Sequence, residues 1–306
     1  MAIHCQRRTD THSDLKDSTG HLVQLARGTA LITRPGIGIQ FNTLPGHAII
    51  LPLPKDVRTG AVLTALASAR LPTTTDQLAT SLGFCGFSNH IAVDIIEELL
   101  RAGVLRRHIP HCSVSILRTG HASERLTRAL SKQGVDYRVY DSPHALVHNA
   151  PTGTTAVLPG TLFPHSDLVY MLMQARIPHL TSAAMDGYAI VGPLVVPGHT
   201  ACLNCLDTHY EQQDAGWKSI RLQATGRPMS ADPLNGDIAA LATASLITAH
   251  ILPWMAAGSP HHAIPTTALC RVDYRLEDSL VKTHPPIPRW RDCMSCQMAA
   301  VTPHSA

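Results

Sequence analysis

Two closely spaced pairs of cysteines are the residues of this sequence best suited to chemistry: Cys202 with Cys205, and Cys293 with Cys296. The CxxC spacing lets both thiolates of a pair reach one metal ion, and two pairs supply the four sulfur ligands of a tetrahedral zinc site. Four thiolates leave no coordination position for water or substrate, which argues against catalytic zinc. The sequence therefore predicts a structural zinc ion that ties the C-terminal segment to the middle of the chain.

The alternatives to zinc are a redox dithiol and two unrelated turns. A redox CxxC opens a helix in a thioredoxin-like βαβ pattern, whereas a Gly- and Pro-containing strand precedes Cys202 and the segment PPIPRWRDCMSC surrounds the second pair. The loop between the pairs is far longer than the roughly 15–20 residues of a compact zinc ribbon. The metal is therefore expected to clamp a larger domain. The remaining cysteines are expected to be ordinary thiols: Cys5, Cys85, Cys112 and Cys270.

Polar residues close to the first CxxC have two interpretations. Asp207, His209 and Asp214 could be catalytic, but helix caps and polar groups around the metal are the favoured interpretation. His250 lies in an Ala-rich predicted helix and is expected to be a hydrogen-bonded core histidine rather than a ligand.

Composition limits the class of protein. A chain of 306 residues with 44% apolar residues has room for two globular domains, and only 4% aromatic residues implies an aliphatic core. A net charge of +3 gives no case for a broad basic face that binds nucleic acid. The start of the chain is polar and has no apolar segment of a secretory signal, and no stretch is expected to span a membrane. A cytoplasmic location follows, in which eight cysteines indicate metal and free thiols.

The first third of the chain predicts a tail and a small domain. Residues 1–28 are polar without periodicity and are expected to be disordered. Short Ile- and Leu-rich segments predict an antiparallel meander at residues 29–36, 36–41 and 47–53. Apolar periodicity and capping residues predict helices at residues 56–68, 73–84 and 88–105, and Val104–Leu105 begins a wing strand. The pattern predicts a winged helix-turn-helix over residues 29–110.

The third predicted helix argues against DNA binding. It carries Asp94, Glu97 and Glu98 but only Arg101 as a fixed cation, whereas a recognition helix in the major groove faces phosphates and is expected to be basic. Peptide binding fits better, because an extended segment can add to the exposed edge strand at residues 47–53.

Residues 111–306 predict an α/β domain. Strands and helices alternate from residue 112 to residue 198, which indicates a mostly parallel, doubly wound sheet of the Rossmann type. The turn after the first strand, LRTGHASERL, has one glycine, Gly120, in place of the spaced three of a nucleotide-binding fingerprint. This argues against an adenylating site there, although ATP binding stays an alternative. Residues 235–258 predict a long, buried, Ala-rich helix.

One stretch carries a resemblance to a known family. The segment DGYAIVGPLVVPGHTACLNCLDTHYEQQDAGW (186–217), followed by the Ala-rich helix and a terminal CxxC, resembles the ubiquitin-activating-enzyme-like (ThiF-like) proteins of ribosomal peptide biosynthesis. These are the leader-peptide-binding partners of YcaO cyclodehydratases in azoline, thiopeptide and related bacteriocin pathways. The resemblance covers roughly residues 29–300 and is most specific over VGPLVVPGHTACLNCLD.

The resemblance implies roles for particular residues. The four cysteines match the zinc ligands of the family. The precursor's leader would pair with the third strand and pack on the third helix; the implied contacts are His47, Ile49, Ile50, Leu51, Ile91, Ile95 and Leu99. For the three helix residues, the spacing itself favours buried core.

The resemblance also implies a division of labour. Many members have lost the nucleotide site of the adenylating fold, and the missing glycines agree with that loss. The YcaO partner would activate the peptide backbone with ATP and cyclise Cys, Ser or Thr, and this chain would be a non-catalytic subunit that delivers the precursor. The alternatives are an active adenylating enzyme of the ThiF type and a winged-helix DNA-binding regulator. The adenylating fold is commonly dimeric, so a homodimer stays open.

Overall fold

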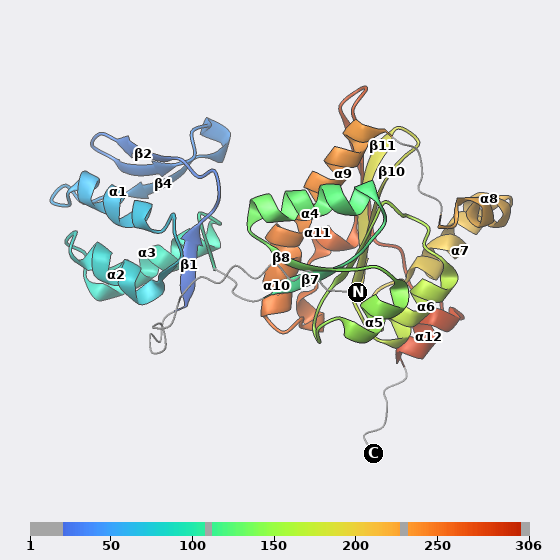
Figure 1. The fold of residues 1–306 in the computed structure, drawn as a ribbon. Helices are drawn as coiled ribbons and strands as arrows, with labels where there is room; N and C mark the ends of the chain where they lie inside the picture. Colours follow the sequence, from blue (N-terminus) through green and yellow to red (C-terminus); the bar gives the residue numbers. More distant parts are fainter. Residues whose placement is uncertain (1–20, 108–111, 227–231, 301–306) are drawn as a thin grey trace, which may run out of the picture. The chain divides into compact units, whose positions relative to one another are not determined.

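A computed structural model describes residues 21–107, 112–226 and 232–300. The chain divides into two compact units, Met1–Ile109 and Pro110–Ala306 (Figure 1). They are called unit 1 and unit 2 below, and each is described by itself.

Unit 1 contains two small antiparallel sheets. Strands β2 (Leu31–Arg34), β3 (Gly38–Phe41) and β4 (Ile49–Pro52) form one sheet in that order. The predicted meander is thus confirmed. The second sheet has the order β5-β1-β6, with β1 at Leu22–Leu25, β5 at Thr73–Thr74 and β6 at Leu105–Arg107.

Strand β1 contradicts part of the predicted disordered tail. Residues 1–20 lie outside the described residues, but the expectation of disorder is wrong at Leu22–Leu25. Val23 and Leu25 are buried in the core of unit 1, and β1 pairs on its two sides with β5 and β6. Alternation over only four residues, two of them buried, is too short to identify a strand from the sequence when the preceding residues are polar.

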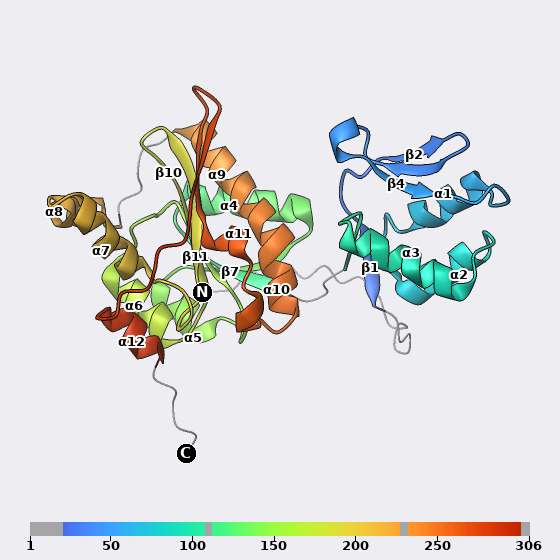
Figure 2. The same cartoon turned by 180° about the vertical axis from the view of Figure 1, so that it is seen from behind.

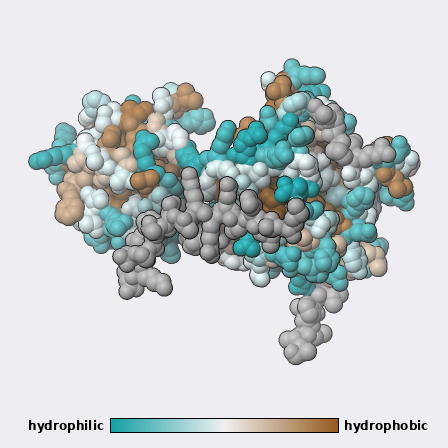
Figure 3. Space-filling model, viewed as in Figure 1, coloured by the Kyte–Doolittle hydropathy of each residue, from teal (hydrophilic) through white to brown (hydrophobic). Residues whose placement is uncertain are grey.

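Three helices pack against these sheets: α1 (Thr59–Ser68), α2 (Thr75–Gly83) and α3 (Asn89–Arg101). Thr74 and Gln77 form a reciprocal capping box that starts α2, and the Ser88 hydroxyl accepts a hydrogen bond from the Ile91 N–H at the start of α3. The core between sheets and helices is aliphatic except for Phe41 and Phe87. Large apolar side chains also reach the surface, such as Phe84, which is 88% exposed, and hydrophobic residues are visible on the face of unit 1 in Figure 3.

Unit 2 is built on a sheet of seven strands in the order β13-β12-β11-β10-β9-β7-β8. The strands are β7 (Ser113–Leu117), β8 (Asp136–Tyr140), β9 (Ala156–Pro159), β10 (His179–Met185), β11 (Tyr188–Val195), β12 (Arg271–Arg275) and β13 (Leu280–His284). Pairs from β8 to β10 are parallel, and pairs from β10 to β13 are antiparallel. The prediction of a mostly parallel sheet is therefore wrong for its second half.

The physical reason is the turn between β10 and β11. Asp186 and Gly187 both have positive φ angles, 53° and 78°, and they connect Met185 directly to its partner Tyr188. Asp-Gly is the preferred sequence of such a two-residue hairpin turn. A parallel connection needs a crossover of a dozen or more residues, so this turn forces an antiparallel neighbour.

The parallel half has helices on both faces. Strand β8 lies on one side of β7 and β9 on the other, so right-handed crossovers place α4 (His121–Gln133) on one face and α5 (Pro143–Asn149) with α6 (Ser166–Gln174) on the opposite face. Helix α5 was not predicted. Unit 2 also contains α7 (Leu203–Gln213), α8 (Trp217–Ala224), α11 (Thr266–Leu269) and α12 (Met294–Ala300).

The predicted Ala-rich helix is α9 (Pro233–Leu246), which continues through a π-helical turn at Ile247–Ile251 into α10 (Leu252–Ala256). Over Pro233–Ala256 it is long and apolar enough to cross a membrane by length and composition, so the expectation that no stretch qualifies is wrong on that criterion. Helix α9 packs on β10, β11 and α4, and Figure 2 shows it lying along the sheet. Core helices of soluble domains meet the same criterion.

Candidate functional site

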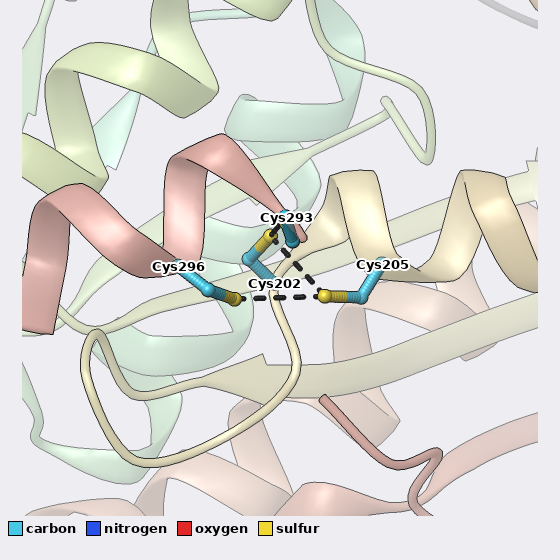
Figure 4. Close-up of side chains that lie close together, drawn as sticks. All are labelled: Cys202, Cys205, Cys293 and Cys296. Carbon is cyan, nitrogen blue, oxygen red and sulfur yellow. Dashed lines mark hydrogen bonds between the residues drawn. The ribbon is translucent and has the colours of Figure 1, made fainter. Parts of the chain in front are cut away.

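The four predicted metal ligands lie together in unit 2. Each of Cys202, Cys205, Cys293 and Cys296 has its Sγ atom within 4.8 Å of the other three, and they are the one group among the described residues that could hold a metal ion (Figure 4). Three of the four side chains are buried. The predicted juxtaposition of the two pairs is confirmed.

The sulfur–sulfur distances fit a tetrahedron. Cys202 Sγ lies 3.8 Å from Cys205 Sγ and 3.4 Å from Cys293 Sγ, and Cys205 Sγ lies 3.5 Å from Cys296 Sγ. Zinc–sulfur bonds of about 2.3 Å give a tetrahedral edge of about 3.8 Å, whereas a disulfide would need about 2.05 Å. All four cysteines are free thiols. The donor set and its spacing therefore fit a tetrahedral ion with soft ligands.

Two helix starts position the thiols. Cys202 is the N-cap of α7 with Cys205 in its first turn, and Cys293 directly precedes α12, which carries Cys296. The partial positive charge at a helix N-terminus stabilises thiolate. The backbone N–H of Trp290 donates to Cys205 Sγ at 3.5 Å, which stabilises negative charge on that sulfur.

A direct side-chain bond and a small core hold the two helix starts together. Asn204 Nδ2 donates to Ser295 Oγ at 2.6 Å, one residue before each second cysteine. Val169 and Met173 of α6, together with Val195 and Leu203, pack around the thiols. The clamp thus joins three helices of unit 2.

The thiols are strongly coupled to one another. Hydrogen bonds from Cys202, Cys293 and the Trp290 N–H lower the pKa of Cys205 to about 6. Hydrogen bonds among the same four thiols raise the pKa of Cys202 and lower the pKa of Cys296. Four thiolates this close repel one another unless a cation lies between them.

The polar residues that follow the first CxxC form structural contacts. Asp207 accepts hydrogen bonds from Arg221 Nε at 3.0 and 2.9 Å and from Trp217 Nε1 at 3.2 Å, which joins α7 to α8. Burial raises the pKa of Asp207 and the Arg221 charge opposes that rise. Asp214 accepts from the Gly216 N–H at 2.8 Å. His209 contacts Gln213. Asp207 and Asp214 thus join α7 to α8, whereas His209 bonds within α7, and none of these contacts involves the thiols.

The predicted edge strand β4 is the last strand of its sheet, paired on one side with β3. The Leu53 N–H donates to Ile37 O at 2.9 Å, and the antiparallel register then turns the N–H groups of Ile49 and Leu51 toward β3. The N–H and C=O of Ile50 point to the open edge. Pro52 has no N–H, so Ile50 carries the outward donor of β4.

The side chains of β4 alternate between the core of unit 1 and solvent. Ile49 and Leu51 pack on the core of unit 1, whereas Ile50 is 41% exposed. His47 precedes the strand in a short 3₁₀ turn and is exposed. Gly38 on β3 is required for this pairing, because a side chain there would collide with the Leu51 carbonyl.

The three predicted contacts on α3 separate. Ile95 and Leu99 are 8% and 3% exposed and belong to the core, as their spacing indicates. Ile91 is 48% exposed, so the core interpretation is wrong for this residue. The buried face of α3 is centred on Ala92, Ile95, Ile96 and Leu99. Ile91 lies at the margin of this face, where its side chain reaches solvent. Of the three, Ile91 is the accessible one.

A cavity of about 690 Å³ lies at the crevice beside Gly120, between the carboxyl ends of β7, β9 and β10 and helices α4 and α9. In doubly wound sheets ligands bind at this kind of switch point. Its charged lining residues, within the described ranges, are Arg125 and Asp232, and Arg125 already pairs with Asp237 at 3.0 Å. The crevice is thus present, but its described lining offers no cluster of cations for a triphosphate.

A smaller cavity of about 240 Å³ lies between α9, β11 and β12. His250 lines it from the π-helical turn, together with Cys270 and Tyr274. His250 is half-buried rather than fully in the core as predicted, and it lies in a π-helical turn that hydrophobic periodicity does not reveal. Cys85, Cys112 and Cys270 are free thiols, as predicted, and Cys5 lies outside the described residues.

Comparisons with known proteins bear on the fold. No protein-family model and no curated protein match the sequence. The structure of the heterocyclase TruD matches 90% of this chain with a TM-score of 0.56 at 15% identity. A heterocyclase in complex with substrate and cofactor matches 90% with a TM-score of 0.57, also at 15% identity. E. coli MccB matches 90% of this chain and 97% of its own at 12% identity, with a TM-score of 0.47.

At this level of identity, the two heterocyclases show a shared fold. This chain spans 43% of the length of TruD and 39% of the other heterocyclase.

Proposed function

We propose that this chain binds the leader of a ribosomally made precursor peptide and delivers it to a YcaO cyclodehydratase, which forms azolines from Cys, Ser or Thr. In this proposal unit 1 is a winged-helix recognition domain for the precursor, and unit 2 is a ThiF-like domain without its own chemistry.

The observation that carries the proposal is the open edge of β4. An unpaired edge strand is a template for an extended peptide, whose backbone can bond to the N–H and C=O of Ile50. The exposed Ile50 side chain offers an apolar contact beside that bond. Edge strands are often blunted by proline, and Pro52 limits the open stretch to a short one. A short template suits a defined peptide register better than indiscriminate strand pairing.

The fold match supports the same division of labour. The match covers 43% and 39% of the two heterocyclases, and in this proposal a YcaO protein supplies the cyclising activity. One of the two was solved with substrate and cofactor, which fits a peptide-handling role for the shared part.

Zinc is the ion we propose for the four-cysteine centre. It would hold α7 and α12 at a fixed distance, and four thiolates fill its coordination. Its role would be structural, because the free energy of metal binding becomes folding free energy.

An adenylating enzyme is the second candidate, and the cavity beside Gly120 is the observation that favours it. Transferring a nucleotidyl group requires positive groups around three phosphates. The described lining has Arg125, paired with Asp237, and the opposing charge of Asp232. The non-catalytic role is therefore preferred. A DNA-binding regulator is disfavoured by the acidic residues of α3: Asp94, Glu97 and Glu98.

Reconstitution tests the proposal. The genes next to that of this chain are searched for a YcaO protein and a short Cys/Ser/Thr-rich precursor. The purified chain is mixed with ATP and these two candidates, and loss of water from the peptide is followed by mass spectrometry. We expect dehydration with the complete mixture, none when this chain is omitted, and no ATP hydrolysis by this chain with the precursor alone. Pyrophosphate release by the chain alone would instead establish the adenylating enzyme.

A further inference from the structure

Two arginine and two histidine side chains lie near one another on an exposed part of unit 2 close to the metal centre. His199 and His261 stack face to face with ring centroids 3.5 Å apart and an interplanar angle of 17°. Arg289 donates to the carbonyl of Gly198, the residue before His199, at 2.6 Å. All three of these side chains belong to exposed residues, as does Arg176.

Arg176 lies near the same residues. It follows α6 in a left-handed conformation with φ of 54°. Partial burial lowers the pKa of His199, and electrostatic interactions with His261, Arg289 and Arg176 lower it further. The surface therefore combines groups from the end of α6, the β11–α7 loop, the turn after α10 and the segment before the second CxxC.

Arg289 differs from several other arginines of unit 2. Five of them pair with carboxylates within 4.0 Å: Arg118, Arg125, Arg221, Arg271 and Arg275. Arg289, by contrast, gives its N–H groups to the carbonyls of Gly198 and Cys296. These contacts fix the guanidinium in place and leave its charge without neutralisation from those partners.

We propose that Arg176, His199, His261 and Arg289 form a docking surface for an acidic segment of a partner protein. This docking surface would be a second binding site, in addition to the open edge of β4 in unit 1. Guanidinium groups bind carboxylates in pairs, and each imidazole keeps one N–H donor even when neutral. The cavities of unit 2 described above are lined by other residues, so a carboxylate-bearing chain laid across the surface fits better than a small enclosed anion.

The metal centre fixes this docking surface. Arg289 lies four residues before Cys293 and donates to the carbonyl of Cys296 at 3.4 Å, and Gly198 lies four residues before Cys202. Closing the four-cysteine cluster therefore brings Arg289 beside His199. The metal centre would therefore do more than stabilise unit 2, because it also brings together side chains that are distant in the sequence.

The test uses the full chain and a fluorescein-labelled oligoglutamate peptide, with oligolysine as the charge control and fluorescence anisotropy as the readout. We expect oligoglutamate binding that weakens with salt and falls about tenfold in the Arg176→Glu/His261→Glu variant, since two attractive contacts become repulsive. The matched control is Arg128→Glu/His148→Glu, which changes the same charges at exposed residues of α4 and α5 and is expected to bind like the wild type.

Three results would overturn the proposal. They are an absence of oligoglutamate binding, an equal loss in both double variants, and displacement of the peptide by inorganic phosphate at a similar concentration of charge. Metal content and melting temperature are measured on each variant. If the first variant is unstable, Arg176→Gln removes one positive charge without adding a negative one, leaves the contacts of Arg289 intact, and must still weaken binding. Leader binding to unit 1 is measured separately, so failure here is distinguishable from failure of the proposed function.

Discussion

The metal centre of unit 2 and the β4 edge of unit 1 are opposite kinds of site. In the first, four side chains of one type converge inside a packed core, and every ligand has its partners within the unit. In the second, the groups that matter are the backbone N–H and C=O of Ile50, and they face outward. A closed site of this kind can be predicted from residue types and their spacing. An open backbone site depends on which strand edge stays unpaired, which the fold determines.

The largest expected effect comes from opening the closed site. Cys293→Ser removes one thiolate ligand, so the metal should be lost and unit 2 should be destabilised by several kcal/mol, because structural zinc contributes on the order of 10 kcal/mol to folding in small domains. Metal analysis and thermal unfolding measure this. Cys270→Ser, a thiol outside the cluster, is the matched control and should keep its metal. Unchanged metal content in Cys293→Ser would rule out the four-thiolate site.

Acid should weaken the core of unit 2 through His179. This residue is fully buried at the start of β10, and desolvation lowers its pKa to about 4 although its Nδ1 contacts the Ile177 carbonyl. Its folded pKa lies below the unfolded value, so the unfolded chain gains the proton first and stability falls as pH drops from about 6.5 to 4. The loss approaches about 3 kcal/mol. The free energy of unfolding, measured with urea at several pH values across this range, should depend less on pH in His179→Leu than in the wild type. An equal pH dependence in the two proteins would exclude His179 as the cause.

The open edge is probed with proline. Ile50→Pro removes the outward donor of β4 without touching the bonds to β3, so we expect precursor affinity to fall about thirtyfold, near 2 kcal/mol, with little change in melting temperature. Thr33→Pro is the matched control. Its N–H points out from the opposite edge of the same sheet, on β2, and Thr33 is exposed. If both substitutions weaken binding equally, the peptide does not add to β4.

The smallest effect concerns the support of unit 1. Thr74→Ala removes the capping box of α2 and should cost about 1 kcal/mol of stability, measured by chemical unfolding. Because α2 packs on α3 rather than on β4, precursor affinity should stay unchanged. If precursor affinity fell together with stability, the binding edge of β4 would depend on the packing of α2, contrary to this prediction.

The sequence predicted the cysteine cluster because CxxC spacing constrains four ligands at once, and it predicted the β2–β4 meander because Pro and Gly bound each strand. It missed the reversal of the sheet at Asp186–Gly187, although Asp-Gly is a hairpin signal, since the alternating pattern of the first half was extended across it. The positions of Ile91 and His250 depended on tertiary packing and on a π-turn. Neither is visible in periodicity alone.

The most direct test of the central claim follows the amide proton of Ile50. Hydrogen exchange of the full chain is measured with and without the candidate precursor used in the reconstitution. If the leader adds as a strand to β4, the Ile50 amide becomes protected while the amides of Ile49 and Leu51, already bonded to β3, change little. An Ile50 amide that exchanges equally fast while the peptide is demonstrably bound would contradict the account.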